Sequence, residues 1–169
     1  MLMPTAVSVE PIAPADVDAV LALNAACVPH VGAGDGVRLA DLVAQAAFAA
    51  LVRDESGVAG FVLALPPTAR YGSPNFGWFC ERYDRFLYVD RIAVAERCRS
   101  RGLGRRLYEA VFAAARQRGD ALVACEVNLV PSNPDSLAFH ERLGFRRVGE
   151  LRHRVGEYEV AMLVADAAG

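Results

Sequence analysis

The sequence predicts a mixed α/β fold in which one sheet is flanked by helices. Apolar runs of strand length alternate along the chain with helical segments that are apolar on one face. Turns containing glycine, proline and aspartate separate these segments. The 169 residues show no linker and no internal repeat. Because this length suits one domain with a substantial core, we expect a single domain over residues 1–169.

The N-terminal half is expected to contain a strand, two helices and a β-hairpin. The expected elements are a strand over Val7–Ile12, a helix opened by Pro14 and Asp16 that runs to Ala26, a loop over Cys27–Val37, a helix over Leu39–Ala47, and strands over Phe48–Arg53 and Val58–Leu65. Asp54–Gly57 between the last two runs predicts a hairpin turn. The segment Pro66–Arg85 is too long for a simple turn, and loops of that length are commonly functional.

The C-terminal half is expected to alternate strands and helices. The expected elements are a strand over Phe86–Val94, a helix over Leu103–Gln117, a buried strand over Ala121–Val127, a short helix over Asp135–Leu143, and a closing strand pair over Phe145–Leu151 and Tyr158–Val164. Arg118 and Gly119 are expected to end the longer helix.

The turn Arg99-Ser-Arg-Gly-Leu-Gly-Arg-Arg-Leu107 joins a predicted strand to a predicted helix. Gly102 and Gly104 remove side chains there, so backbone N–H groups can approach a ligand closely. The first N–H groups of a helix have no internal partner and lie at the positive end of the helix dipole. Arginines surround the turn: Arg97, Arg99, Arg101, Arg105 and Arg106. The turn therefore predicts a pyrophosphate-binding site.

Other interpretations of this turn are less favoured. A dinucleotide fingerprint needs a third glycine where the chain has Leu107, and an acidic residue about 20 positions later. A P-loop needs a lysine after the glycines, and the chain contains no lysine. A solvated, arginine-rich loop remains an alternative.

Two motifs in this half resemble the GNAT superfamily of acyl-CoA-dependent N-acetyltransferases. Arg99-Ser-Arg-Gly-Leu-Gly104 fits that superfamily's pyrophosphate pattern R/Q-x-x-G-x-G/A. Asn133-Pro-Asp-Ser-Leu-Ala-Phe-His-Glu-Arg-Leu-Gly-Phe145 resembles its second signature, N-x-x-A/S-x-x-F/L-Y-x-x-x-G-F. The resemblance implies a GNAT-like mixed, mostly antiparallel sheet of about six to seven strands flanked by about four helices. It also implies acetyl-CoA as co-substrate and no metal.

The resemblance assigns cofactor contacts to three segments. It places the pyrophosphate at Arg99–Gly104 and the pantetheine arm along the backbone of Ile92, Ala93 and Val94. The further cofactor-binding residues that it implies are Ser100, Arg101, Gly102, Leu103, Arg105, Asn133, Ser136, Phe139 and His140. Asn133 is also a favoured residue at a helix start.

Glu126 is the leading candidate for the catalytic base. It interrupts the apolar run Ala121–Val127, where a charge is costly unless it is paired or useful. Partial burial would raise its pKa toward neutrality. The glutamate also resembles the base of bacterial ribosomal-protein alanine acetyltransferases. The alternative is that Glu126 only pairs with an arginine, in which case Asp90 and Tyr88 are the reserve candidates.

His140 stands where the family pattern has a tyrosine. In the family pattern this tyrosine can donate a proton or hydrogen bond to the departing thiolate. A histidine N–H could donate the same hydrogen bond, so His140 is the candidate acid. Phosphinothricin acetyltransferases resemble this chain in carrying Phe-His-Glu in the same segment. The alternative is that His140 only packs against the cofactor.

The resemblance places the acceptor site at Asn24–Leu39 and Thr68–Arg85. The candidate acceptor-binding residues are Asn24, Val31, Tyr71, Trp78, Tyr83 and Asp84. Aromatic rings with carboxylates suit an amine. The alternative for Glu81 and Asp84 is a surface pairing with Arg82 or Arg85.

Composition limits the partners. The net charge of −2 gives no general attraction to nucleic acid or membrane. No apolar run reaches transmembrane length, and the N-terminus lacks a signal-peptide pattern. Four scattered cysteines without CxxC spacing favour reduced thiols, so we expect a cytoplasmic protein. Related proteins are often dimers, and a homodimer is expected on that ground alone.

We therefore expect transfer of an acetyl group from acetyl-CoA to a primary amine, by direct attack in a ternary complex. A small-molecule or amino-acid-like acceptor is slightly favoured. The alternatives are a protein N-terminal or lysine acetyltransferase, and a catalytically silent acyl-CoA-binding regulatory module. A nucleic-acid-binding domain that uses the arginines would show strongly salt-dependent binding, and the near-neutral charge disfavours it.

Overall fold

The computed structural model describes residues 7–28, 36–154 and 157–168. These ranges contain one seven-stranded sheet with the order β1-β2-β3-β4-β5-β7-β6, together with five α-helices. The strands are β1 (Glu10–Pro11), β2 (Phe48–Asp54), β3 (Gly57–Leu65), β4 (Phe86–Val94), β5 (Leu122–Val130), β6 (Arg146–His153) and β7 (Tyr158–Asp166). The helices are α1 (Val17–Ala26), α2 (Gly36–Gln45), α3 (Pro74–Cys80), α4 (Leu103–Arg118) and α5 (Pro134–Arg142), with 3₁₀ turns η1 (Pro14–Asp16) and η2 (Glu96–Cys98).

The structure confirms the predicted mixed, mostly antiparallel sheet and corrects some boundaries. The segment Pro66–Arg85 contains the helix α3, which the sequence analysis missed. Ser73 caps this helix, since its hydroxyl accepts a hydrogen bond from the Phe76 N–H, and Pro74 occupies its first turn. The first strand is only two residues long, and α2 begins at Gly36, before the expected start.

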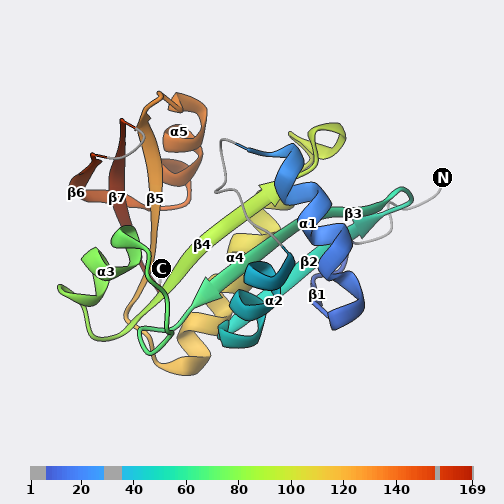
Figure 1. Cartoon of the computed structure of the whole chain (residues 1–169), viewed down its shortest axis with the longest axis horizontal. Helices are drawn as coiled ribbons and strands as arrows, with labels where there is room; N and C mark the ends of the chain where they lie inside the picture. Colours follow the sequence, from blue (N-terminus) through green and yellow to red (C-terminus); the bar gives the residue numbers. More distant parts are fainter. Residues whose placement is uncertain (1–6, 29–35, 155–156, 169) are drawn as a thin grey trace.

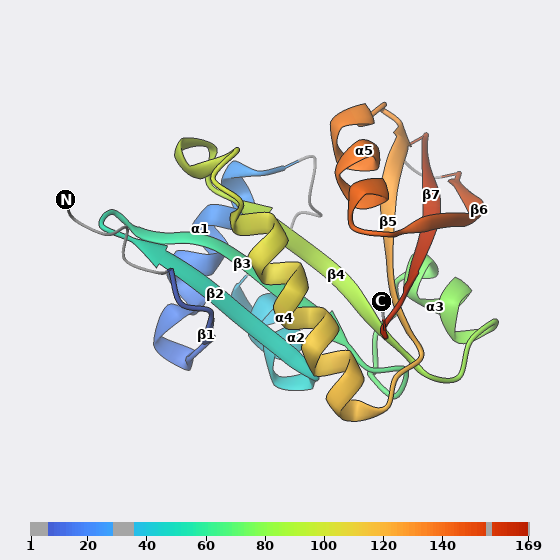
Figure 2. The same cartoon turned by 180° about the vertical axis from the view of Figure 1, so that it is seen from behind.

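Helices cover both faces of the N-terminal part of the sheet. Figure 1 shows α1 and α2 in front of β2 and β3, and Figure 2 shows α4 across the opposite face. One face of α4 is buried against the sheet through Leu103, Leu107, Tyr108, Val111 and Ala115. β3 is almost wholly buried because helices lie on both of its faces. No helix in the described ranges is long and apolar enough to span a membrane.

Strands β4 and β5 form the parallel pair of this sheet, and their pairing is short. It extends only from Phe86 opposite Leu122 to Tyr88 opposite Ala124. Beyond this point the two strands diverge, as the separation of their ends in Figure 1 shows. A register shift against β3 makes Asp90 an extra residue of β4, between Val89 and Arg91. The divergence exposes one edge of β4 at the centre of the sheet.

Candidate active site

The diverging edges of β4 and β5 include the backbone segment predicted to hold the pantetheine arm. On one side, Ile92, Ala93 and Val94 pair with Val62, Phe61 and Gly60 of β3. On the other side, no strand of the described residues pairs with them. Peptide groups on this side are therefore placed to bind an extended ligand in the manner of an added strand. The cofactor role of these three residues remains a prediction.

The predicted pyrophosphate loop lies between η2 and α4. Ser100 and Gly102 adopt positive φ angles of 64° and 78°, and Gly102 is the N-cap residue of α4. No side chain caps this helix start, and no acidic residue lies in its first turn. The first intrahelical bond is made by the N–H of Arg106, so the N–H groups of the preceding turn remain for another acceptor. This arrangement suits an anion.

The arginines around this loop divide into two groups. Arg97 donates two hydrogen bonds to Asp54 in the β2–β3 turn, at 3.1 and 3.0 Å, and Arg106 donates to the Val7 carbonyl at 3.0 Å. Arg99, Arg101 and Arg105 are exposed and form no ion pair within the described ranges. The charge available for a phosphate therefore comes from the second group.

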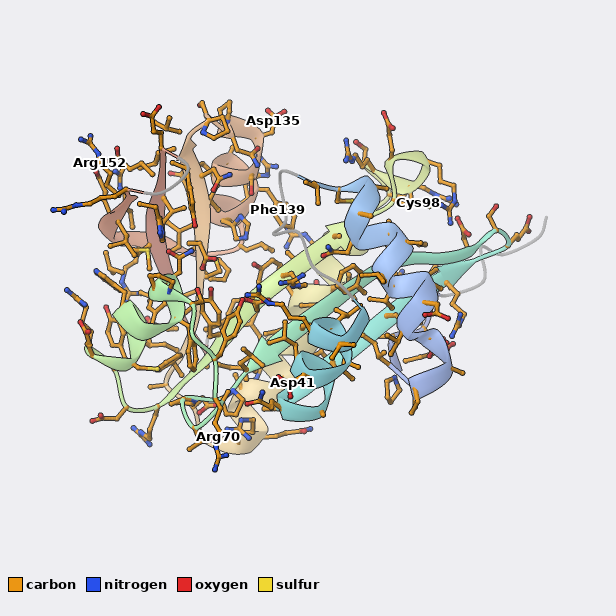
Figure 3. All side chains as sticks on the ribbon, in the orientation of Figure 1. Asp41, Arg70, Cys98, Asp135, Phe139 and Arg152 are labelled. Carbon is orange, nitrogen blue, oxygen red and sulfur yellow. The ribbon has the colours of Figure 1, made fainter. Side chains whose placement is uncertain are left out.

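Gly104 allows α5 to approach the start of α4. A Cβ atom at this position would lie 3.1 Å from Cζ of Phe139. Figure 3 shows Phe139 on the side of α5 that faces β4, while Cys98 lies in the turn before α4. Asn133 caps α5, because its side-chain oxygen accepts a hydrogen bond from the Ser136 N–H at 3.3 Å. Its predicted capping role is thus confirmed, and its cofactor role remains a prediction.

Glu126 lies on β5 just beyond the point where β4 and β5 separate. The hydroxyl of Tyr88 donates to both of its carboxylate oxygens, at 3.0 and 2.8 Å. Desolvation, followed by repulsion from Asp90, raises the pKa of Glu126 to about 8, and hydrogen bonds from Tyr88 and Asn75 oppose this rise. No arginine pairs with it in the described ranges, so the alternative interpretation of Glu126 as an ion-pair residue is not what the structure shows.

Asp90 lies beside Glu126 but is engaged by its neighbour. The Arg91 guanidinium donates to the Asp90 carboxylate at 2.8 Å, and both side chains are only 4% exposed. Arg91 also donates to the Asn24 side chain on α1 at 3.1 Å. The Tyr71 ring lies beside Asp90, and burial, together with the Asp90 charge, raises the pKa of Tyr71 to about 12. These contacts bring two predicted acceptor residues, Asn24 and Tyr71, to the carboxylate pair.

His140 is buried between α4 and α5, with both ring nitrogens bonded inside the protein. Nδ1 lies 2.7 Å from the Ser136 carbonyl, and Nε2 lies 2.7 Å from the Tyr108 hydroxyl. Since a carbonyl can only accept, Nδ1 carries the proton and Nε2 accepts from Tyr108. Burial lowers the pKa of His140 and so favours this neutral ring. No N–H of the ring is left for a thiolate in this arrangement, although the acid role itself remains a prediction.

The other predicted acceptor residues in the described ranges contact parts of the protein other than Glu126. Trp78 packs against Gly149 and stacks with the Arg82 guanidinium, whose carbon lies 3.9 Å from the ring centroid. Tyr83 packs on Phe79, and Asp84 is exposed. Glu81 pairs with Arg82 at the surface, as the alternative interpretation expected. Val31 lies outside the described residues.

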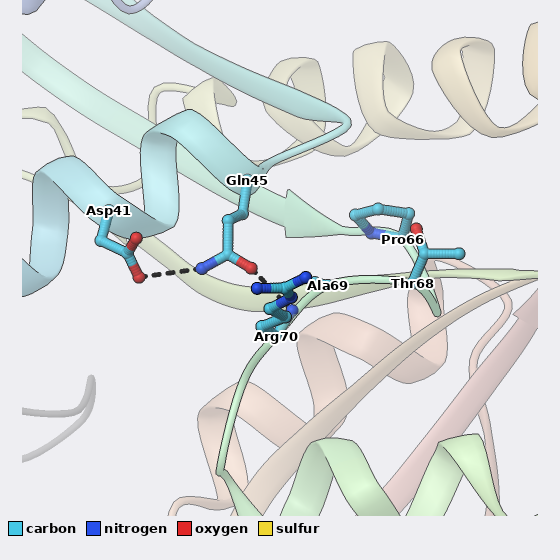
Figure 4. Close-up of a pocket in the computed structure, with 6 residues that line it drawn as sticks. All are labelled: Asp41, Gln45, Pro66, Thr68, Ala69 and Arg70. Carbon is cyan, nitrogen blue, oxygen red and sulfur yellow. Dashed lines mark hydrogen bonds between the residues drawn. The ribbon is translucent and has the colours of Figure 1, made fainter.

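A cavity of about 400 Å³ lies beside the start of the predicted acceptor segment. Its lining residues are Asp41, Gln45, Pro66, Thr68, Ala69 and Arg70 (Figure 4). Gln45 links its two sides, since its amide accepts from the Arg70 N–H at 2.6 Å and donates to Asp41 at 2.8 Å. None of these residues bonds to Glu126 or Asp90, so the cavity lies outside the carboxylate cluster.

Sequence reasoning missed Asn75 and Tyr108, and passed over His153. Asn75 is the polar residue of the apolar stretch Pro74–Cys80, and that contrast is the signal that could have found it. Tyr108 lies on the buried face of α4, where its hydroxyl could have suggested an internal partner. No cluster of three or more metal-ligating side chains occurs in the described part of the chain.

The chain is similar to known acetyltransferases in sequence and in structure. A model of the acetyltransferase (GNAT) family matches residues 25–145. No curated protein sequence matches the chain significantly. The ribosomal-protein-S18-alanine N-acetyltransferase from Escherichia coli has a similar structure, with a TM-score of 0.72, 17% identity, and coverage of 96% of this chain and 94% of that one.

Two further solved structures are similar. Ard1 from Thermoplasma volcanium has a TM-score of 0.78 at 17% identity, covering 96% of this chain and 98% of that one. The protein yncA from Salmonella typhimurium, whose structure contains its cofactor acetyl-CoA, has a TM-score of 0.72 at 15% identity, covering 96% and 95%. At these identities the similarity supports the fold.

Proposed function

The chain belongs to the acetyltransferase (GNAT) family of enzymes that use acetyl-CoA as co-substrate, and we propose that it acetylates the primary amine of a small-molecule or amino-acid-like acceptor. In this proposal the amine attacks directly, in a complex that holds both substrates. The single observation that carries the proposal is the Glu126 carboxylate, partly buried beside the separating strands with a pKa raised to about 8. A base near neutral pKa is matched to removing a proton from an ammonium group.

The residues present fit acetyl-CoA. The uncapped start of α4, the left-handed residues Ser100 and Gly102, and the exposed Arg99, Arg101 and Arg105 together form a donor set suited to a pyrophosphate. Bound there, the co-substrate supplies the acetyl thioester that the amine attacks. The open edge of β4 at Ile92–Val94 would align its arm, and a backbone N–H there would polarise the carbonyl.

The charges beside Glu126 support an amine acceptor. Glu126 and Asp90 are two carboxylates, and Arg91 is the guanidinium that pairs with Asp90. When Glu126 is ionised, this trio carries a net negative charge, which attracts an ammonium group. Glu126 then takes one proton from the ammonium, and the amine lone pair forms the C–N bond as the C–S bond breaks. The second proton leaves the new amide nitrogen and goes to the departing thiolate, which gives the thiol of CoA. Asn24 and Tyr71 border the same cluster and are the proposed acceptor contacts.

A thiol-release assay with acetyl-CoA and a panel of acceptors tests this function. The panel combines small amines and amino acids with peptides that begin in alanine, because one structural neighbour acts on a ribosomal-protein alanine. We expect release with small acceptors and a loss of about 10²–10⁴-fold in Glu126→Gln. Glu109→Gln, an exposed carboxylate on α4, is the matched control and should retain the wild-type rate. Release with peptides alone would overturn the acceptor class, and full activity in Glu126→Gln would overturn the base.

A further inference from the structure

Asn75 links Glu126 to the edge of the sheet. Asn75 on α3 lies beside the Glu126 carboxylate and lowers its pKa. The other end of the same amide faces His153, the last residue of β6, with 2.7 Å between Asn75 Oδ1 and His153 Nε2. Asn75 is 8% exposed. Segments from three parts of the sequence therefore meet in one line of contacts that ends at the proposed base.

The chemistry of each group decides which end of the Asn75 amide faces which neighbour. An ionised carboxylate can only accept, so Asn75 presents its NH₂ group to Glu126. Its carbonyl oxygen then faces His153 and must receive a proton-bearing nitrogen, which is Nε2. His153 stacks on Tyr158 of β7, with ring centroids 4.1 Å apart and planes 10° apart. This stacking fixes the plane of the imidazole and therefore the direction of its N–H.

We propose that His153 and Asn75 are positioning residues for Glu126: His153 holds the Asn75 amide in the orientation that directs its NH₂ group at the carboxylate. This inference deepens the proposed function, because it concerns the group assigned there as the base. A free asparagine amide could rotate and present its oxygen to Glu126, which would replace attraction by repulsion. The His153 N–H removes that freedom, since only the amide oxygen can accept it.

The packing of α3 supports this arrangement independently. Phe76 and Phe79 of α3 contact the ring of Tyr88, with centroids 5.3 and 5.7 Å apart, and so fix the helix over β4. On its other side, Trp78 lies against Gly149 of β6. A Cβ atom at Gly149 would lie 2.5 Å from Trp78 Cζ2, so only glycine permits this separation of α3 from β6. The same separation brings His153 within hydrogen-bond distance of Asn75.

Other groups also act on Glu126, and the test must separate them from Asn75. Tyr88 and Asp90 face it from β4, Tyr158 from β7 and Tyr108 from α4, while Cys125 is its neighbour on β5. Tyr88 donates to the carboxylate directly, and Asp90 repels it. Of these groups, only Tyr158 also contacts His153, through the stacking of the two rings. A change at His153 therefore acts on Asn75 and on Tyr158, and the variant His153→Gln, which loses the stacked ring but keeps a side-chain N–H, separates the two effects.

The test measures the pKa of Glu126 directly, by ¹³C NMR of the whole chain labelled at its glutamate carboxyl carbons. Glu126→Gln identifies the signal. We expect Asn75→Ala to raise the pKa by about one unit, because a donor to the carboxylate is lost. Asn75→Asp should raise it further through like charge. His153→Ala should raise it by a smaller amount, and His153→Gln, which keeps a side-chain N–H, should restore it.

Matched variants separate positioning from general loss of structure. Arg152 is the neighbour of His153 in the chain, but its side chain points away from the sheet in Figure 3 and pairs with Glu159. Arg152→Ala should therefore leave the Glu126 pKa unchanged. Gly149→Ala should raise the pKa by pushing α3 from β6. If Asn75→Ala fails to fold, the comparison of His153→Ala with His153→Gln on the edge strand decides the matter alone.

The outcomes distinguish this inference from the proposed function. An unchanged Glu126 pKa in His153→Ala, or a lowered one in Asn75→Ala, overturns the positioning role even if Glu126→Gln is inactive. Conversely, the expected pKa shifts with full activity in Glu126→Gln would support the positioning role and overturn the assignment of the base.

Discussion

The hydroxyl of Tyr108 on α4 and Nε2 of His140 on α5 lie 2.7 Å apart in the core, and their rings meet at 84°. His140 is the residue at which this sequence departs from the tyrosine of its family motif. With Nδ1 bonded to the Ser136 carbonyl, its ring joins two helices through polar contacts. This geometry gives His140 a structural contact in the core, while its predicted packing against the cofactor and its predicted acid role stay predictions.

We therefore expect His140→Ala to reduce stability more than catalysis. The change leaves the buried Tyr108 hydroxyl without its acceptor, at a cost of about 1–3 kcal/mol in the free energy of unfolding. Denaturation by urea measures this cost, with Tyr108→Phe as the partner variant that removes the donor instead. The rate of thiol release, corrected for the folded fraction, should fall less than tenfold. A loss of 100-fold or more would support the acid role, since general acids contribute about 10²–10⁴-fold.

The raised pKa of Glu126 predicts a pH dependence of stability. Its folded-state pKa of about 8 lies above the ordinary glutamate pKa of 4.5, so the folded protein holds this proton more tightly than the unfolded chain. The contribution is thus fully present below pH 4.5 and is lost as pH rises to about 8. Between these values the wild type should lose more than about 1.4 kcal/mol, the equivalent of one pKa unit, relative to Glu126→Gln.

Urea unfolding of both proteins at pH 5 and pH 8.5 measures this difference. Because the two proteins share all other titrating groups, the difference between their free energies of unfolding isolates the contribution of Glu126. Glu126→Gln should gain in stability relative to the wild type at the higher pH. A gap between the two proteins that stays constant over this range would show that the carboxylate is not held in a desolvated site.

The sequence predicted those parts of the fold that local patterns specify. The alternating apolar runs predicted the strands, and the glycine turn before Leu103 predicted the helix start at its observed position. The helix α3 was missed because the segment's prolines, glycines and aromatics are typical of a loop, whereas packing of Phe76 and Phe79 on Tyr88 stabilises a helix there. The length of β1 was overestimated, because Pro11 has no backbone N–H to donate to a neighbouring strand.

The residues of the candidate site also divide into those that a local sequence pattern reveals and those that only the fold brings together. Glu126 could be identified because a charge within an apolar run is conspicuous in the sequence alone. Asn75 and His153 could not, because their role depends on contacts between residues 78 positions apart in the chain. The internal bonds of His140 were likewise hidden, since Tyr108 appears in the sequence only as part of the apolar face of α4.

The carboxylate of Asp54 connects the β2–β3 turn to the segment that leads into the predicted pyrophosphate loop. It accepts two hydrogen bonds from Arg97 and one from the Cys98 thiol at 3.0 Å, and the Ser56 N–H donates to it at 2.8 Å. The hydrogen bonds from Arg97 and Cys98 hold the pKa of Asp54 well below its usual range. Asp54 thus anchors η2 immediately before Arg99, while Arg97 is kept from the loop.

Asp54→Ala should therefore weaken the binding of acetyl-CoA without a matching loss in turnover. Once η2 is released, the loop must be ordered when the cofactor binds, so we expect the KM for acetyl-CoA to rise about tenfold, while kcat changes less than twofold. Steady-state thiol release and calorimetric titration with CoA measure the two effects. Asp16→Ala, which breaks the surface pair with Arg53 instead, is the control and should leave both constants unchanged. Tighter binding of CoA by Asp54→Ala would show that the freed Arg97 contacts the phosphates, and that Asp54 restrains this arginine rather than the loop.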